Sequence, residues 1–328
     1  MDFWYRKKGL LSILMLPLAL LFWLISMLKK VSYLGRSYRS SLPVICVGNI
    51  VVGGSGKTPV VIKIVEMLQA QGLKVAVVSR GYKSSLSSSK GVVIVDDEYS
   101  ADEVGDEPLM IYKKTGASVY VSPDRSKSAK VAENHNCDVI VMDDGMQNYT
   151  LKKDIIISVF NGKNGVGNGF LMPAGCLRES LFSGVVKSDM AIFMGDDSTG
   201  ISSKFKSFVT GKLAADKVSV KELKKVKNYI AFAGIGKPEK FFKSLNDIGL
   251  NVLYQMEFED HYSYSDEDIK RLLNFAKQEE ATLVTTEKDF VKISKKFKKE
   301  ILVLPVAVEF SKNDLKKLEK LLHSVIVK

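Results

Sequence analysis

A short stretch from Gly53 to Thr58 has the residue types and the spacing needed to bind the phosphates of a nucleotide. Glycines let backbone N–H groups face a phosphate because no Cβ atom stands in the way. Lys57 can reach the β- and γ-phosphates and serve their transfer, and the Thr58 hydroxyl can ligate Mg²⁺. The prediction is an ATP-binding loop made of Gly53, Gly54, Ser55, Gly56, Lys57 and Thr58.

The sequence on both sides of this loop supports the prediction, although one glycine of the usual pattern is missing. A strict phosphate-binding loop has glycine at the position of Val51. An apolar run from Pro43 onward indicates a strand before the loop, and apolar residues at helical spacing from Val60 to Leu68 indicate a helix after it. Because an accidental glycine turn does not require such neighbours, the phosphate-binding interpretation is preferred.

Two pairs of acidic residues could supply metal ligands and a general base. Asp143 and Asp144 end an apolar run, as magnesium-binding carboxylates often do in such folds, although Asp-Gly is also a favoured turn pair. Asp106 and Glu107 precede a proline, where they could start a helix, accept a hydroxyl proton or hold a metal ion. The predicted metal ligands are Thr58, Glu107, Asp143 and Asp144.

One histidine and three arginines are further candidates. A lone histidine such as His261 is usually structural, but one that faces a carboxylate could tune or relay its proton, and the sequence alone does not pair it with Asp106. Arg80, Arg125 and Arg178 stand in loops marked by glycine or proline, where guanidinium groups can bind anionic oxygens. Each arginine taken singly is more often a solvated surface residue.

These residues must be held by a framework, and the chain alternates short apolar runs with helical stretches. Such alternation predicts an α/β fold of the P-loop NTPase type, with a mostly parallel sheet covered by helices on both faces. The expected strands are 75–79, 92–95, 118–121, 139–142, 155–160 and 190–194, then 229–233, 252–255, 283–286 and 301–308. We expect a kinase domain over 34–227 and a smaller C-terminal α/β domain over 228–328.

The N-terminal segment is apolar, and residues 9–28 contain no charged side chain. As one helix they would extend about 30 Å, the thickness of a bilayer's hydrocarbon core. Arg6, Lys7 and Lys8 precede this segment, and Lys29 and Lys30 follow it. A cleaved signal peptide or a buried helix is an alternative, but we expect a membrane-anchoring helix within 1–33, either spanning or lying in one leaflet.

Composition limits the class of protein. The 328 residues are 46% hydrophobic and 26% charged, which suits a folded protein with room for two domains. A net charge of +11 favours acidic partners, such as anionic lipid headgroups or phosphorylated substrates, without choosing among them. Three cysteines without metal-type spacing indicate reduced, mostly buried thiols, and three histidines make a histidine-rich metal site improbable.

In their order along the chain, these stretches resemble the tetraacyldisaccharide 4′-kinase family of lipid A biosynthesis. The resemblance covers nearly the whole chain, and the family also lacks the loop glycine replaced here by Val51. The matching stretches are Gly-Gly-Ser-Gly-Lys-Thr-Pro at 53–59, Ser-Arg-Gly-Tyr at 79–82, Gly-Asp-Glu-Pro at 105–108, Asp-Asp-Gly-Met-Gln at 143–147, Leu-Met-Pro-Ala-Gly at 171–175, Leu-Arg-Glu at 177–179, Ala-Gly-Ile at 233–235, Asp-His-Tyr at 260–262 and Thr-Glu-Lys-Asp at 286–289.

The resemblance implies ATP-dependent phosphorylation of the 4′-hydroxyl of tetraacyldisaccharide 1-phosphate, which gives lipid IVA. It implies that Asp106 is the catalytic base, helped by His261 from the second domain, and that Asp143 and Asp144 support Mg²⁺ and the phosphate loop. It also implies a site at the cytoplasmic face of the bacterial inner membrane, with no nucleic-acid partner. Residues expected near the lipid headgroup or the transferred phosphate are Arg80, Arg125, Asn148, Arg178 and Glu179.

The chain departs from the family at Asn148, where a histidine is usual. Asn148 keeps a hydrogen-bonding group but carries no charge, so it could bind a headgroup only through neutral hydrogen bonds. Two other functions remain open on the residues alone: a membrane-attached nucleotide switch, and a soluble small-molecule kinase. A guanine-specific switch is disfavoured, because the stretch 286–289 is not in the guanine-reading order Asn-Lys-x-Asp.

Overall fold

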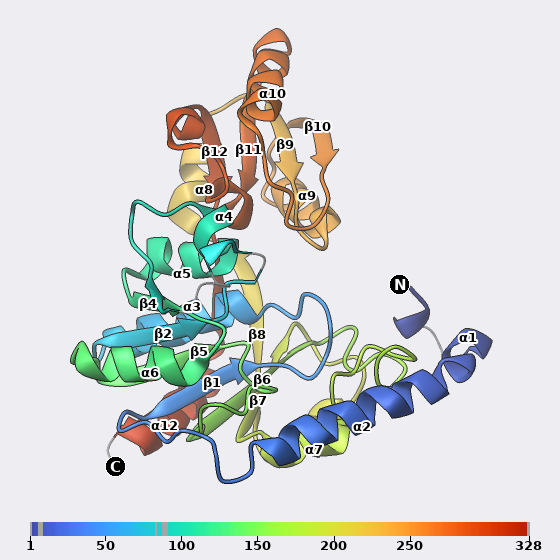
Figure 1. Ribbon diagram of the computed structural model, residues 1–328. Coiled ribbons are helices and arrows are strands. Elements are labelled where there is room, and N and C mark those ends of the chain that lie inside the picture. The colour runs from blue at the N-terminus through green and yellow to red at the C-terminus, as the bar shows by residue number, and fades with distance from the viewer. Residues whose placement is uncertain (1, 6–8, 83, 87–90, 327–328) are drawn as a thin grey trace.

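The computed structural model describes residues 2–5, 9–82, 84–86 and 91–326. It has two parallel-rich sheets, one above the other in Figure 1, and both carry helices. The fold is therefore α/β with a mostly parallel sheet, as the alternation of apolar runs predicted.

The larger sheet has nine strands in the order β13-β8-β7-β6-β1-β5-β2-β4-β3. All neighbours pair in parallel except β3 with β4 and β13 with β8, which lie at the two edges. Its strands are β1 (Val44–Gly48), β2 (Val75–Ser79), β3 (Val93–Ile94), β4 (Ser118–Val121), β5 (Val139–Asp143), β6 (Ile155–Asn161), β7 (Met190–Met194), β8 (Phe208–Ala215) and β13 (Val306–Phe310).

Helices cover both faces of this sheet, so its central strands are buried on both sides. Successive side chains of a strand point to opposite faces, and Ile45 and Val47 accordingly belong to one core while Val44 and Cys46 belong to the other. The helices of this part of the molecule are α3 (Lys57–Gln69), α4 (Ala101–Val104), α5 (Asp106–Thr115), α6 (Arg125–Asn134), α7 (Leu181–Lys187) and α12 (Lys312–Ile326).

The smaller sheet has four parallel strands in the order β10-β9-β11-β12. It too has a core on each face, since Tyr229 and Ile230 of β9 contribute to different clusters. Its strands are β9 (Tyr229–Ala233), β10 (Val252–Glu257), β11 (Thr282–Thr286) and β12 (Ile301–Leu304), and its helices are α8 (Lys217–Leu223), α9 (Pro238–Asp247), α10 (Asp266–Gln278) and α11 (Glu287–Phe290).

The end of the chain returns to the larger sheet, which differs from the expected unit over 228–328. The single strand expected over 301–308 is two strands, because Pro305 separates β12 from β13. β12 pairs with β11 in the smaller sheet, whereas β13 pairs with β8 in the larger one. Leu318 and Leu322 of α12 then join the core of the larger sheet. The smaller sheet therefore occupies the chain between β8 and β13.

The N-terminal apolar segment forms two helices rather than the single helix expected over 9–28. Helix α1 (Leu10–Leu14) ends at Met15, and α2 (Leu16–Ser32) begins there with Pro17 in its first turn, where a missing N–H is tolerated. In the described ranges no helix combines the length and hydropathy needed to cross a membrane. Arg6, Lys7 and Lys8, expected to flank the segment, lie outside the described residues.

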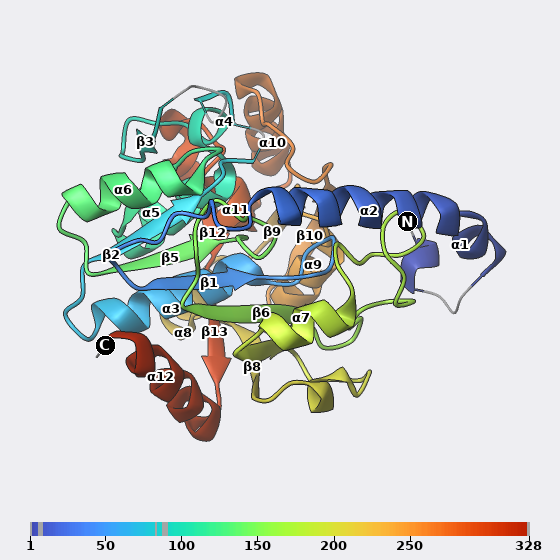
Figure 2. The same cartoon turned by 60° about the horizontal axis from the view of Figure 1, so that its bottom comes forward.

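The apolar side chains of these two helices are mostly exposed, and α1 projects beyond the rest of the molecule in both views (Figures 1 and 2). Leu10, Leu14 and Leu28 have exposed fractions of 74%, 66% and 69%. Monomeric soluble proteins seldom expose an apolar surface of this extent. The preceding Trp4 is buried instead, and its Nε1 donates to the carbonyl of Pro173 at 2.9 Å.

Candidate active site

The glycine-rich loop connects β1, a central strand, to the start of α3. Gly53 and Gly56 have φ angles of 106° and 85°, in the left-handed region that favours glycine. Asn49 donates to Ser55 Oγ at 2.9 Å and fixes the two ends of the loop. Val51, which replaces the usual glycine, is buried and forms a backbone bridge to Leu177. Val51 therefore packs in the interior at the position where the usual pattern has a glycine.

Asp144 lies beside this loop and forms ion pairs with two positively charged side chains. It directly follows β5, the strand beside β1, and adopts a left-handed φ of 47°. Its carboxylate lies 3.6 Å from Lys57 Nζ and 3.0 Å from Arg178 Nη1. Burial would raise the pKa of Asp144, but Lys57 and Arg178 outweigh burial and lower it. Lys57, Asp144 and Arg178 therefore form one ionic cluster at the carboxyl ends of the strands.

The neighbouring Asp143, unlike Asp144, has a raised pKa. It is the last residue of β5, it is 2% exposed, and its Oδ2 accepts from Ser79 Oγ at 3.2 Å. Its Oδ1 is buried and, within the described residues, has no hydrogen-bond partner. Burial, followed by the charges of Glu107 and Asp144, raises the pKa of Asp143 to about 7. A buried carboxylate oxygen that accepts no hydrogen bond could instead be a ligand of a cation.

The three candidate arginines lie in different environments. Arg80 directly follows β2 and is exposed, while Arg178 is held by Asp144. Arg125 is 3% exposed at the start of α6, and its Nη1 donates to the Ser122 carbonyl at 3.1 Å. Its Nε is buried without a partner in the described chain. Burial lowers the pKa of Arg125 to about 10, against the opposing effect of Asp143, so a charged donor remains available inside the site.

Asp106 and His261 are brought together from the two halves of the molecule. Asp106 begins α5 after Gly105, which packs against Gly81 in the loop that follows β2. His261 follows β10 in the smaller part, with a left-handed φ of 64°, and its backbone N–H donates to Gly234. The two side chains meet at 2.8 Å between His261 Nδ1 and Asp106 Oδ2. The pairing that the sequence left open is thus present.

Asp106 is buried and His261 is partly buried, and neighbouring charges lower the pKa of the carboxyl group. Asp106 is 7% exposed, and its Oδ1 accepts from the Glu107 backbone N–H at 2.8 Å. Burial would raise the pKa of Asp106, but the hydrogen bond from His261 and the charge of Lys288 outweigh burial and lower it. The ring of Tyr82 packs edge-on against His261 at 5.8 Å. Asp106 is therefore an ionised, oriented carboxylate, which is what a general base requires.

Glu179 and Asn148 are engaged in contacts within the larger part. Glu179 accepts from Gln147 Nε2 at 2.9 Å and from Ser183 Oγ at 2.7 Å. Asn148 Oδ1 accepts from the backbone N–H and the hydroxyl of Thr150, at 3.1 and 3.0 Å, and so closes its own turn. The Asn148 side chain therefore stabilises a local turn.

Two residues that sequence reasoning left without a role also enter the site. Gln147 Nε2 bonds both Glu179 and the Asn49 carbonyl at 3.0 Å, and so connects the phosphate loop to Glu179. Lys288 of α11 lies 3.6 Å from Asp106 and 3.4 Å from Glu107. Gln147 lies in the stretch 143–147 and Lys288 in the stretch 286–289, two of the stretches on which the resemblance rests. Their position in these stretches was the sequence signal that could have identified them.

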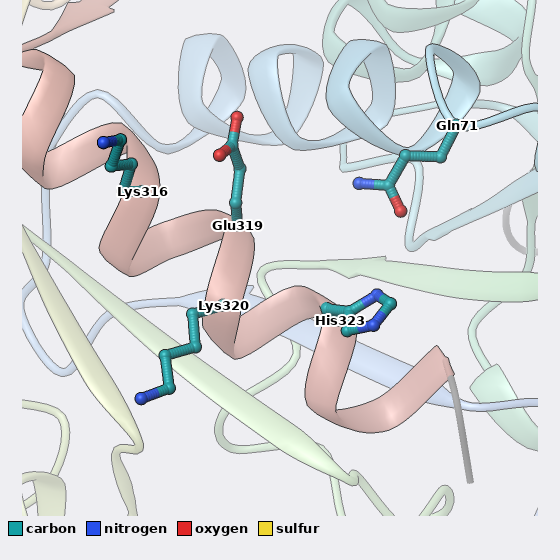
Figure 3. A pocket seen from close by; sticks show the side chains of 5 residues that line it. All are labelled: Gln71, Lys316, Glu319, Lys320 and His323. Carbon is teal, nitrogen blue, oxygen red and sulfur yellow. The ribbon is translucent and has the colours of Figure 1, made fainter.

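A surface pocket elsewhere is separate from this cluster. Figure 3 shows the side chains that line it, which are Gln71 and, from α12, Lys316, Glu319, Lys320 and His323. Gln71 follows the carboxyl end of α3, whereas the phosphate loop stands at the other end of that helix. None of the candidate site residues lines this pocket.

Comparison with known proteins identifies relatives over the full length. The family profile described as tetraacyldisaccharide-1-P 4′-kinase matches residues 11–326. A protein named tetraacyldisaccharide 4′-kinase from Actinobacillus succinogenes is 38% identical over 315 residues, covering 95% of this chain and 94% of its own. One of the same name from Vibrio vulnificus is 38% identical over 332 residues, covering 98% and 96%.

A solved structure resembles the whole fold as well. The crystal structure of LpxK from Aquifex aeolicus in complex with ATP superposes with a TM-score of 0.77 and 29% sequence identity. The match covers 97% of this chain and 100% of that one. Both halves of the present molecule therefore have counterparts in an ATP-binding relative.

Proposed function

The chain belongs to the tetraacyldisaccharide-1-P 4′-kinase family, and from this premise we propose the reaction and the roles of its residues. The protein is a lipid kinase that transfers the γ-phosphoryl group of ATP to the 4′-hydroxyl of tetraacyldisaccharide 1-phosphate and gives lipid IVA. The observation that carries the residue assignment is the 2.8 Å contact of His261 with Asp106, on the sheet edge that also bears the glycine-rich loop.

Asp106 acts as the general base. The 4′-hydroxyl gives its proton to the Asp106 carboxylate while its oxygen forms a bond to the γ-phosphorus. The bond from that phosphorus to the bridging oxygen breaks, and ADP leaves with the electron pair. The low pKa of Asp106 keeps the carboxylate ionised before the step, and His261 orients it. General bases of this kind contribute about 10²- to 10⁴-fold to rate.

The phosphate groups are held by the glycine-rich loop and by nearby positive charges. Backbone N–H groups of Gly53, Gly54, Ser55 and Gly56 stand at the amino terminus of α3, whose dipole favours an anion. Lys57 is already held beside Asp144 at 3.6 Å. Transfer of Lys57 from that carboxylate to the phosphates would leave Asp144 with Arg178 as its partner.

Mg²⁺ fits the residues at this edge, and we propose that Thr58, Glu107, Asp143 and Asp144 hold it directly or through water. The buried Oδ1 of Asp143 without a partner supports the proposal. Within the described chain no three acidic, histidine or cysteine side chains form a metal cluster by themselves, which is compatible with an ion that keeps waters and phosphate oxygens as ligands. When bound, Mg²⁺ would neutralise the negative charge that develops on the phosphates.

The anionic headgroup of the lipid would be bound by arginines. Arg80 is exposed beside the site, Arg125 presents a buried donor without a partner, and Arg178 reaches Asp144. Asn148 and Glu179 contribute less directly, because Thr150 and Gln147 already engage them. Forked guanidinium donors match phosphate oxygens.

We further propose that α1 and α2 lie in one leaflet of the bacterial inner membrane, with both sheets on the cytoplasmic side where ATP is available. Support comes from the exposed apolar side chains of these helices and from Lys29 and Lys30 at the end of α2. A nucleic acid is not required as a partner. Replacing Leu10, Leu14 and Leu28 together with aspartate should release the protein from anionic vesicles in a sedimentation assay, and full retention would contradict the proposal.

The reaction is tested by transfer of ³²P from γ-labelled ATP to detergent-solubilised tetraacyldisaccharide 1-phosphate. Label should appear in the lipid with the wild-type protein and be lost with Lys57→Ala. Phosphate released only to water would favour a nucleotide switch, and transfer only to a water-soluble acceptor would favour a soluble kinase.

A further inference from the structure

Lys288 of α11 lies where the two halves of the molecule meet. Its Nζ lies 3.3 Å from His261 Nε2, 3.4 Å from Glu107 Oε1 and 3.6 Å from Asp106 Oδ2. The side chain is only 19% exposed, so this long and flexible group is confined to one place. Of the groups around it, His261 is the one that offers a nitrogen rather than a carboxylate.

The donor and acceptor roles in this cluster follow from the chemistry of lysine. An ammonium group has three N–H donors and no acceptor, so Nε2 of His261 must present its lone pair to Lys288. Asp106 Oδ2 also faces the Lys288 ammonium and presents lone pairs to it. The proton in the 2.8 Å contact between His261 and Asp106 therefore belongs to Nδ1 of the ring.

The charged form of His261 does not fit this geometry. An imidazolium would direct an N–H at an ammonium group 3.3 Å away, so two like charges would meet. Asp260 Oδ1 stands 3.9 Å from Nε2, which is beyond hydrogen-bond distance and offers no substitute acceptor. The neutral ring with its proton on Nδ1 satisfies Lys288 and Asp106 together.

We propose that Lys288 is a positioning residue that fixes His261 in the Nδ1–H tautomer, so that His261 orients Asp106 as a donor and does not take the proton from it. This inference rests on the proposed role of Asp106 as the base. Asp106 then receives one hydrogen bond on each carboxylate oxygen, from the Glu107 N–H and from His261. The proton taken from the substrate hydroxyl stays on Asp106, because Nδ1 already carries one.

The tautomer can be measured in the resting wild-type protein. The chain has only 3 histidines, so selective ¹⁵N labelling of histidine gives three imidazole spin systems, and His261→Asn assigns that of His261. At neutral pH we expect a pyrrole-type ¹⁵N shift at Nδ1 and a pyridine-type shift at Nε2. Two pyrrole-type nitrogens, or the reverse pattern, would overturn the proposal. No substrate is needed, so this result is independent of whether the proposed reaction is correct.

Substitution of Lys288 then tests its influence on the ring. In Lys288→Met we expect the single tautomer to give way to a mixture and kcat to fall by about 10- to 100-fold, as for a lost orienting contact, with the KM for ATP unchanged. Lys288→Arg, which is again only a donor, should restore the tautomer and most of kcat. Lys221→Met, the same change on the exposed face of α8, is the matched control and should alter neither.

Two results would contradict the role of Lys288. One is a wild-type kcat in Lys288→Met. The other is a reduced kcat with the His261 tautomer unchanged, since that would indicate a general packing role. Thermal unfolding of each variant identifies loss of fold, and if Lys288→Met does not fold, the wild-type tautomer and the Lys288→Arg result decide the question.

Discussion

The two acidic pairs of the site are assembled in different ways. Asp143 ends β5 and Asp144 follows it, and their side-chain contacts with Ser79, Lys57 and Arg178 lie within the larger part of the molecule. Asp106 begins α5 in the same part, but His261 and Lys288 reach it from the smaller one. The residues proposed to bind the phosphates thus make their contacts within one part, whereas the proposed base, Asp106, has partners from both parts.

From this difference we expect that changes in the smaller part can leave nucleotide binding intact. α11 is the element in contact, since Glu287 pairs with Lys114 near the end of α5 while Lys288 faces its beginning. Asp289 of the same helix accepts a hydrogen bond from the Gly234 N–H at 3.1 Å. The Gly234 carbonyl in turn accepts a hydrogen bond from the backbone N–H of His261.

The largest effect is expected for Asp289→Ala. Asp289 is fully buried and pairs with Lys292 at 2.6 Å, so the change leaves a buried charge unpaired and should cost about 3 to 5 kcal/mol. Hydrogen exchange should accelerate in β9 and β11 while β1 and β5 stay protected. Equal acceleration in both sheets would mean that the two parts unfold as one unit.

Asp106→Ala should affect turnover next most strongly. We expect kcat to fall by about 10²-fold or more because the general base is lost, while the dissociation constant for ATP stays close to the wild-type value. Lys57→Ala should instead weaken ATP binding, since it alters the region built within the larger part. Near-normal turnover in Asp106→Ala would rule out its role as base.

A smaller effect is expected for Lys114→Met. Lys114 Nζ donates to both carboxylate oxygens of Glu287, at 2.6 and 2.8 Å, and to the Val306 carbonyl at 2.8 Å. Its loss should destabilise the contact between α5 and α11 by about 1 to 2 kcal/mol and lower kcat a few-fold at constant KM for ATP. Lys113→Met, at the neighbouring position, serves as the control, because the ion pair of Lys113 is with the exposed Asp97 and not with α11. A raised KM for ATP would show that the two regions are coupled.

The smallest effect is expected for Asn148→Ala. Its side chain closes a local turn through Thr150, so the change should cost about 1 kcal/mol of stability and leave kcat within a few-fold of wild type. Denaturant unfolding and lipid phosphorylation assays measure the two quantities. A large rise in the KM for the lipid would instead identify Asn148 as a headgroup ligand.

The sequence predicted the central strands and the phosphate loop because their signals are local. β1, β2 and β5 are buried on both faces and therefore appear as continuous apolar runs. β8 was missed, since Phe208–Ala215 is only partly buried near the sheet edge and mixes polar with apolar residues. The N-terminal segment was taken as one helix because apolar composition does not reveal the turn at Met15.

By itself the sequence determined the α/β class, the glycine-rich loop and the identity of the acids, since each depends on residues close together in the chain. Only the tertiary structure decided that Pro305 sends β13 back to the larger sheet, that His261 meets Asp106 across 155 positions, and that Lys288 lies beside both. These contacts join elements far apart along the chain, and their geometry depends on how two separately packed sheets are placed against each other.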